Sequence, residues 1–193
     1  MNKENLLTEI SKMSENEREL LSYDTSDVEI LNILAEDEKM CVRKGVAWNE
    51  HTSVGTLEKL SNDEYSEVRT EVAGNKNAPA MILDKLAKDG HEDVRFKVAG
   101  NKNTSAETLM LLANDISKGV RSNVAGNPYT PPETLALLIK DDEWWVRRAV
   151  ALNKNTPSEL LLKLTKDKNI RISEIAEETL KARKEKSKAC IER

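Results

Sequence analysis

The sequence contains few of the residues that build metal centres and disulfide frameworks. Its 193 residues include two cysteines, Cys41 and Cys190, and two histidines, His51 and His91. The cysteines are far apart and neither belongs to a CxxC pair, so the pattern does not support a disulfide framework. A zinc or iron–sulfur site would need three or four ligands. We therefore expect neither a metal site nor a cofactor.

Long apolar runs are also missing. No stretch approaches the ~18 apolar residues that a transmembrane helix needs. The first residues, MNKENLLTEISKM, are interrupted by charged and polar side chains and so lack the apolar centre of a signal peptide. From these absences we expect no membrane association and a cytoplasmic location.

Motifs of catalysis are absent as well. The chain has no GxSxG, no P-loop, no HExxH and no GxGxxG. Neighbouring carboxylates such as Asp63 and Glu64 fall in expected turns, where such charges normally aid solubility. No pattern places a base beside a nucleophile. We therefore expect a protein that is not an enzyme and has no catalytic residues.

Charge of one sign is not dominant overall, but it is unevenly spread. The net charge is −4, which weighs against a dedicated nucleic-acid binder. Residues 1–67 hold 16 Asp and Glu against 7 Lys and Arg, whereas residues 68–193 hold 18 against 23. The simplest interpretation is two differently charged caps that keep both ends soluble. Because the two ends carry opposite charges, copies of the chain could also assemble end to end.

What the chain does have is a repeat of 26 residues. Five copies share a Val-Arg pair, a Val-Ala pair, an asparagine, two leucines and a closing aspartate in the same register. The Val-Arg pairs, for example, begin at Val42, Val68, Val94, Val120 and Val146. Upstream, Leu31, Leu34 and Asp37 keep the register, which indicates a sixth, degraded copy.

Each copy predicts two short helices. In the first, VRxxVA gives an apolar stripe at helical spacing, and a Gly-Asn pair ends it in the middle copies. The second is expected to begin at a threonine or serine N-cap: Thr130 and Thr156 precede proline, and Thr104 and Ser26 repeat the pattern without it. Helices this short are stable only when packed against neighbours.

The predicted fold is an all-α superhelical solenoid of about six two-helix repeats, with short α-helices and possible 3₁₀-helices. We expect a single domain. Its parts are an N-terminal capping helix (1–14), a degenerate first repeat (15–40), five regular repeats (41–169) and a C-terminal capping helix (170–193).

The string VRxxVAxNxxTPxxxLxxLxxD resembles the consensus of the leucine-rich repeat variant family. The clearest matches run from Val120 to Asp141 and from Val146 to Asp167. The resemblance implies alternating short α- and 3₁₀-helices without a sheet, similar in style to HEAT and armadillo arrays. The family's archetype carries an iron–sulfur cluster on N-terminal cysteines. No cysteine precedes Cys41 here, so no cluster residues carry over.

Two fixed rows could serve either structure or binding. The repeated arginine could form a basic ladder for an anion, but its recurrence with an aspartate in every copy favours bonds between neighbouring turns. The repeated asparagine likewise favours an internal ladder to loop backbone groups. We interpret both rows as structural.

Function in such arrays is therefore expected at the positions that do not repeat. Trp144 and Trp145 stand where other copies carry polar residues, which suggests a contact hot spot, although packing under the C-terminal helix is the alternative. A loop edge carries the further candidates Lys76, Lys102, Lys154 and Tyr129, which a solvated edge would also explain. Trp48 stands where other copies carry glycine, and we expect its ring to pack against the fold rather than to bind a partner.

The leading hypothesis is a non-catalytic scaffold that binds an unidentified protein or peptide. The first alternative is a nucleic-acid-binding HEAT-like array, which the net charge disfavours; the lysine edge and a basic tail are compatible with it (Lys181, Arg183, Lys184, Lys186, Lys188). The second alternative is a structural, self-assembling protein.

Overall fold

The computed structural model describes the backbone of residues 3–191 and the side chains of residues 4–185. Residues 1–2 and 192–193 of the expected caps lie outside it, as do the side chains of Lys186, Lys188 and Cys190. Over the described range the chain forms fourteen α-helices and no strand, which confirms the all-α prediction. The 3₁₀-helices that the resemblance implied do not occur in this range, because every short helix is α-helical.

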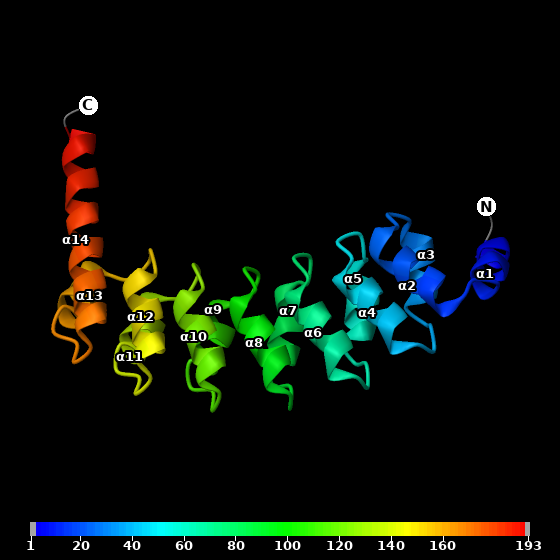
Figure 1. Ribbon diagram of the computed structural model, residues 1–193, viewed down its shortest axis with the longest axis horizontal. Coiled ribbons are helices and arrows are strands. Elements are labelled where there is room, and N and C mark those ends of the chain that lie inside the picture. Colours follow the sequence, from blue (N-terminus) through cyan, green and yellow to red (C-terminus); the bar gives the residue numbers. More distant parts are fainter. Residues whose placement is uncertain (1–2, 192–193) are drawn as a thin grey trace. The chain divides into compact units, whose positions relative to one another are not determined.

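The chain divides into two compact units, Met1–Thr104 and Ser105–Arg193, and the boundary falls inside the third regular copy. In the first unit, α6 packs against α4 and α8, and α2 packs against α4 (Figure 1). Its helices are α1 (Lys3–Ser11), α2 (Glu15–Asp24), α3 (Val28–Leu34), α4 (Met40–Trp48), α5 (Val54–Leu60), α6 (Ser66–Gly74), α7 (Ala80–Leu86) and α8 (Glu92–Gly100).

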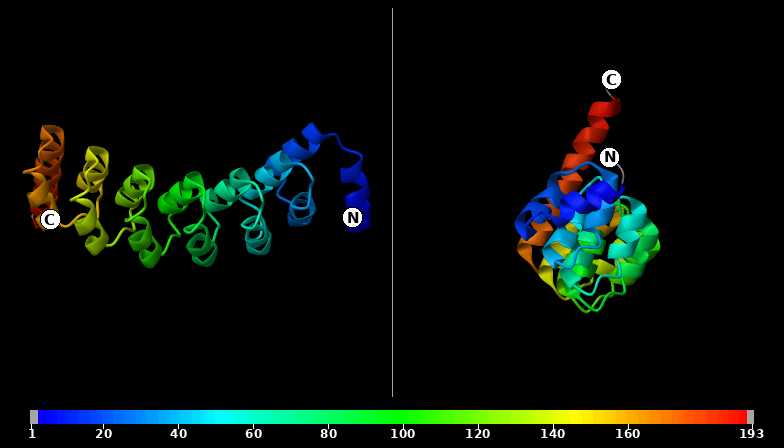
Figure 2. Two further views of the ribbon diagram at one scale, coloured as in Figure 1. Left: turned by 90° about the horizontal axis from the view of Figure 1, so that it is seen from below. Right: turned by 90° about the vertical axis from the view of Figure 1, so that its right-hand side faces the viewer.

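In the second unit, α12 packs against both α10 and α14, and α13 also contacts α14. The short helices of each unit follow one another in pairs in the views of Figure 2. The helices of this unit are α9 (Ala106–Leu112), α10 (Lys118–Gly126), α11 (Pro132–Leu138), α12 (Trp144–Leu152), α13 (Ser158–Leu164) and α14 (Ile170–Ile191).

The core is built from the repeated valines, alanines and leucines. In the first regular copy Val42, Val46, Ala47, Leu57 and Leu60 are at most 2% exposed, and the equivalent residues of the other copies are buried to the same degree. Burying one such valine or leucine stabilises the fold by roughly 1.5–3 kcal/mol. Packing of these rows therefore stabilises helices of seven and nine residues that would not form alone.

The threonine before the second helix is not its N-cap, contrary to the sequence prediction. In four copies its buried hydroxyl donates to a valine carbonyl six residues earlier, at the end of the first helix. The distances are 2.6 Å for Thr52 to Val46, 2.5 Å for Thr104 to Val98, 2.5 Å for Thr130 to Val124 and 2.6 Å for Thr156 to Val150. Each of these valine carbonyls also accepts the backbone N–H of the asparagine after the helix, as in Asn127 to Val124 at 3.2 Å. The threonine therefore adds a second hydrogen bond to a carbonyl of the last turn.

The second helix accordingly begins one residue later than predicted. Ser53 and Ser105 are the N-caps of α5 and α9, and each accepts a hydrogen bond from the backbone three residues on. Asp27, not Ser26, caps α3. The N-caps Pro131 and Pro157 provide no side-chain bond. The first residues of these two helices, Pro132, Glu133, Ser158 and Glu159, are exposed, so water can satisfy the free N–H groups of the first turn.

Candidate functional site: the exposed variable positions

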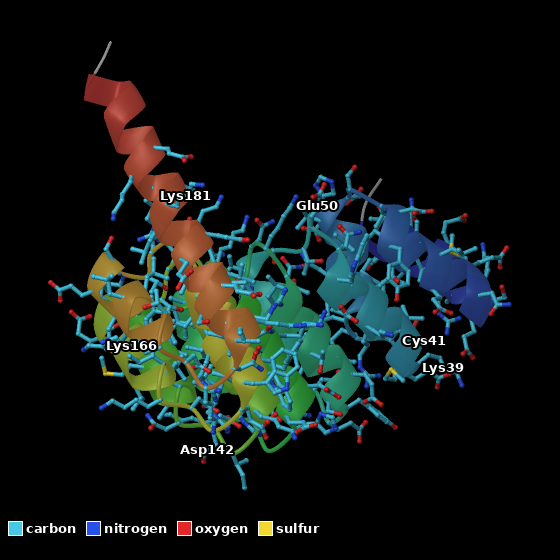
Figure 3. The ribbon with its side chains drawn as sticks, turned by 60° about the vertical axis from the view of Figure 1, so that its left-hand side comes forward. Lys39, Cys41, Glu50, Asp142, Lys166 and Lys181 are labelled. Carbon is cyan, nitrogen blue, oxygen red and sulfur yellow. The ribbon has the colours of Figure 1, made fainter. Side chains whose placement is uncertain are left out.

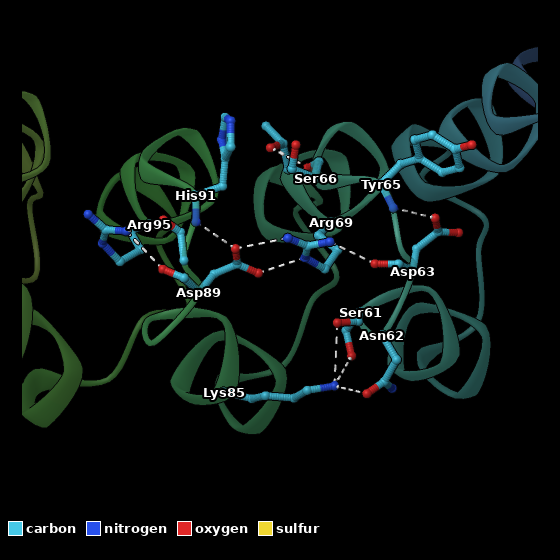
Figure 4. Close-up of polar contacts among 12 residues, drawn as sticks. Ser61, Asn62, Asp63, Tyr65, Ser66, Arg69, Lys85, Asp89, His91 and Arg95 are labelled. Carbon is cyan, nitrogen blue, oxygen red and sulfur yellow. Dashed lines mark hydrogen bonds and ion pairs between the residues drawn. The ribbon is translucent and has the colours of Figure 1, made fainter.

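The repeated arginine is bonded within its own copy. Its Nε and Nη2 donate to both oxygens of the aspartate twenty residues ahead, as in Arg69 to Asp89 at 2.6 and 3.0 Å (Figure 4). The same paired bonds join Arg43 to Asp63, Arg121 to Asp141 and Arg147 to Asp167. Such two-point bonds to a carboxylate are among the stronger hydrogen bonds in proteins.

The third donor of this arginine connects consecutive copies. Nη1 of Arg69 donates to the carbonyl of Asp63, the aspartate that closes the preceding copy, at 2.7 Å (Figure 4). Arg147 makes the same bond to Asp141 at 2.7 Å, and its side chain is only 5% exposed. These geometries confirm the structural interpretation of the arginine row and leave it no role as an anion-binding ladder.

The repeated asparagine also bonds internally. Nδ2 of Asn75 donates to the carbonyls of Ala47 and Asn49 in the preceding copy, at 2.8 and 3.0 Å. Its Oδ1 accepts from the backbone N–H of Asn77 at 2.9 Å. In the second unit, Asn153 donates the same two bonds to the carbonyls of Ala125 and Asn127. Buried amides satisfied on both sides hold adjacent copies in register, which confirms the predicted internal ladder.

Trp144 and Trp145 begin α12, where they form an edge-to-face pair with ring centroids 5.7 Å apart. Trp144 remains 46% exposed and Trp145 is half-buried. The ammonium of Lys118 lies 4.9 Å from the centre of the Trp145 ring and 3.3 Å from Glu143. The pair therefore offers one open aromatic ring beside a cation that is already neutralised.

The loop-edge candidates do not form one cluster with these tryptophans. Tyr129 is 60% exposed in the loop after α10, and Lys154 is exposed in the loop after α12. Trp144 begins α12 while Lys154 follows its end, so they lie at opposite ends of a helix roughly 13 Å long. The second unit thus presents two separate candidate surfaces.

In the first unit, Lys76 and Lys102 are exposed in the loops after α6 and α8. Lys76 forms an ion pair with Glu50, which lies in the loop after α4. Glu50 is labelled in Figure 3. This pairing lowers the pKa of the Glu50 carboxyl, chiefly through the hydrogen bond from Lys76. Lys76 is therefore partly neutralised by its own neighbour.

Trp48 differs from what its sequence pattern favoured. It is 57% exposed and contacts Tyr23 edge-to-face, with centroids 5.5 Å apart. Both rings line an open cavity of about 610 Å³, together with Asp24, Glu71, Gly74 and loop residues of the same unit. Sequence reasoning missed this cavity; the available signal was the tryptophan at a position where the next copies carry glycine.

Among the described side chains, no group of three or more His, Cys, Asp or Glu is arranged to hold a metal ion. Burial, followed by a hydrogen bond to Glu15, raises the pKa of the Cys41 thiol, which disfavours the nucleophilic thiolate. No helix within the described part of the chain has the length and apolar character to cross a membrane.

Short α-helices packed copy against copy, with their fixed polar residues bonded inside, define a helical repeat protein. The leucine rich repeat variant family matches residues 144–169, one regular copy that begins with α12. The match confirms, for this copy, the resemblance noted from the sequence.

Two solved structures are similar to the chain over most of its length. The first, "a leucine-rich repeat variant with a novel repetitive protein structural motif", is 23% identical, with 93% of this chain and 82% of that chain covered and a TM-score of 0.44. The second, a designed armadillo repeat protein in complex with the peptide (KR)4, is 15% identical, with 92% and 98% covered and a TM-score of 0.44. No curated protein matches the chain.

Proposed function

We propose that this chain is a non-catalytic scaffold that binds a protein or peptide through positions that do not repeat. The contact residues we assign are Trp144, Trp145, Tyr129, Lys76, Lys102 and Lys154. The observation that carries the proposal is the 46% exposure of Trp144. The equivalent residues of the other regular copies are the polar Ser66, Glu92 and Lys118 and, in the first copy, Met40. Large aromatic side chains are usually mostly buried, and exposed ones are enriched in binding hot spots.

The bonding of the fixed residues supports the same division of roles. The repeated arginine, asparagine and threonine side chains donate their hydrogen bonds to backbone carbonyls and to aspartates of the repeat itself. A partner therefore meets the variable side chains, which differ from copy to copy and so can encode specificity. As part of this proposal the protein is a single domain that works in the cytoplasm.

The competing nucleic-acid function is less well supported by the contacts of its basic residues. Arg183, which belongs to the basic tail, donates to the carbonyls of Thr156 and Lys154 at 2.6 and 2.8 Å. Lys76 pairs with Glu50. Binding to phosphates releases counterions and requires cations that can approach the backbone of the nucleic acid. Two of the candidate cations are already engaged elsewhere.

The test is affinity capture from the lysate of the source cell, with and without nuclease, comparing the native chain with the Trp144→Ala/Trp145→Ala variant. We expect a specific protein that survives nuclease and is lost with the double change, while the circular dichroism of the variant stays native. Recovery of nucleic acid that weakens steeply with salt would favour the alternative function instead. A mass in light scattering that grows with protein concentration would favour self-assembly.

A further inference from the structure

The cavity of the first unit is distinct from the tryptophan pair of α12. Its walls come from consecutive first helices: Tyr23 and Asp24 on α2, Trp48 on α4, and Glu71 and Gly74 on α6. Trp48 ends α4, and Gly74 ends α6 at the equivalent position. Because glycine has no side chain, the space beside the Trp48 ring stays open.

Two aromatic rings and several carboxylates face this space. Trp48 is 57% exposed and its ring is held by the edge-to-face contact with Tyr23. Asp24 and Glu71 line the same cavity. Burial, followed by the charges of Glu19 and Glu71, raises the pKa of the Tyr23 hydroxyl, so both carboxylates act on this ring. An aromatic face beside carboxylates attracts cations.

A cation of the chain itself already lies at this place. Lys97 comes from α8, lines the cavity and reaches across to α6. A Cβ added to Gly74 would lie 3.5 Å from Cδ of Lys97 and 4.0 Å from its ammonium nitrogen. The cavity therefore accommodates a long basic side chain, and Lys97 is exposed and so can move aside.

We propose that this cavity binds the arginine or lysine side chain of a partner polypeptide, with its cationic group over Trp48 and beside Glu71. The inference rests on the proposed scaffold function and names the chemistry that one of its surfaces recognises. The charge of the surrounding segment agrees, since residues 1–67 hold 16 acidic against 7 basic side chains. The basic lining residue Lys76 is partly neutralised by Glu50, which also lines the cavity.

The competing occupant is an anion held by Lys97 and His51, which also line the cavity. Two changes that each remove one charge separate the two occupants by sign. For a cationic ligand, Glu71→Gln removes an attraction and weakens binding, whereas Lys97→Gln removes a competitor and strengthens it. For an anionic ligand both effects reverse.

The experiment is an NMR titration of the full-length chain that follows the indole N–H signals of its three tryptophans, each assigned by a Trp→Phe variant. The probes are capped five-residue peptides with arginine or glutamine at the centre of four glycines. We expect the arginine peptide to shift the Trp48 signal saturably and the Trp144 signal not at all. We expect the glutamine peptide to bind roughly fivefold more weakly, because it lacks the cation.

In the variants we expect roughly twofold to fivefold weaker binding for Glu71→Gln and a comparable gain for Lys97→Gln. Gly74→Leu should block the cavity, and its Cβ makes only an ordinary contact, so the fold should be kept. Gly126→Leu, at the equivalent position of the second unit, is the matched control and should bind as the native chain does. Equal binding of both peptides, or reversed signs for the two Gln variants, would overturn the proposal.

The peptide titration and the partner capture test different claims, and each can fail without the other. If the peptides do not bind at Trp48 but the Trp144→Ala/Trp145→Ala change still abolishes partner capture, only the cavity inference is wrong. If capture survives that double change while the arginine peptide binds at Trp48, the scaffold contacts its partner through the first unit, and the contact surface assigned to α12 is wrong.

Discussion

The pairing of Arg147 with Asp167 makes the sharpest stability prediction. The two side chains are 5% and 6% exposed, and the guanidinium gives Nε and Nη2 to the carboxylate at 2.7 and 3.1 Å. Asp167→Ala leaves the guanidinium with only its bonds to the carbonyls of Asp141 and Asp142. Removing one partner of a buried ion pair costs about 3–5 kcal/mol.

At about 2–4 °C per kcal/mol for a chain of this size, the melting temperature should fall by roughly 6–20 °C. The assay is thermal unfolding followed by far-ultraviolet circular dichroism at pH 7. The matched control is Glu143→Ala, which breaks the Lys118–Glu143 pair, whose side chains are 57% and 30% exposed. Exposed pairs contribute about 0–1 kcal/mol, so the control should change little. Equal losses in the two variants would refute the reasoning.

The same pair gives the stability a pH dependence. Burial raises the pKa of the Asp167 carboxyl, but the hydrogen bonds from Arg147 and from the Asn169 N–H outweigh it, so the net pKa lies below the ordinary 3.8. A carboxyl with a lowered folded pKa contributes stability above its unfolded pKa and loses it as pH falls through the folded value. The native chain should therefore lose stability below about pH 4 more steeply than Asp167→Ala. Parallel pH profiles would contradict this.

The remaining predictions use matched variants measured by the same unfolding assay. Thr130→Val should cost about 0.5–1.5 kcal/mol because it removes a buried hydrogen bond to the Val124 carbonyl, which keeps its bond from the Asn127 N–H. Thr134→Val should be neutral or stabilising because the Thr134 hydroxyl is buried without a partner; similar losses would contradict the threonine account. Gly45→Ala should destabilise the first unit, since its Cβ would lie 1.8 Å from the Ser22 hydroxyl oxygen. Gly126→Ala has open space and should stabilise by about 0.4–1 kcal/mol. The reverse order of the two alanine variants would show that the helix contacts are misassigned.

The repeat made most of the fold predictable from the sequence. Five aligned copies determine the period of the two helices, and the apolar stripe determines which faces are buried. An arginine and an aspartate that recur together also indicated an internal bond. Comparison of copies identifies residues on which every copy depends, and such residues serve the fold.

The helix N-caps and the exposure of Trp48 could not be predicted, because both depend on contacts in space that the spacing of residues does not reveal. A threonine before a proline matches the N-cap pattern, but the buried carbonyl of Val124 lies within reach of Thr130 only after the loop has closed. In the same way, the exposure of Trp48 depends on α6, the first helix of the next copy, where Gly74 leaves the ring uncovered. Whether a variable side chain packs or stays open is decided by its neighbours in space.

The most direct test of the scaffold account is site-specific photo-crosslinking in the source cell. The photoreactive residue p-benzoylphenylalanine replaces Trp144 in one variant and Glu133, an exposed residue of α11, in the control. The account predicts a nuclease-resistant adduct with a defined protein at position 144 and none at position 133. No adduct at position 144, or the same adducts at both positions, would contradict it.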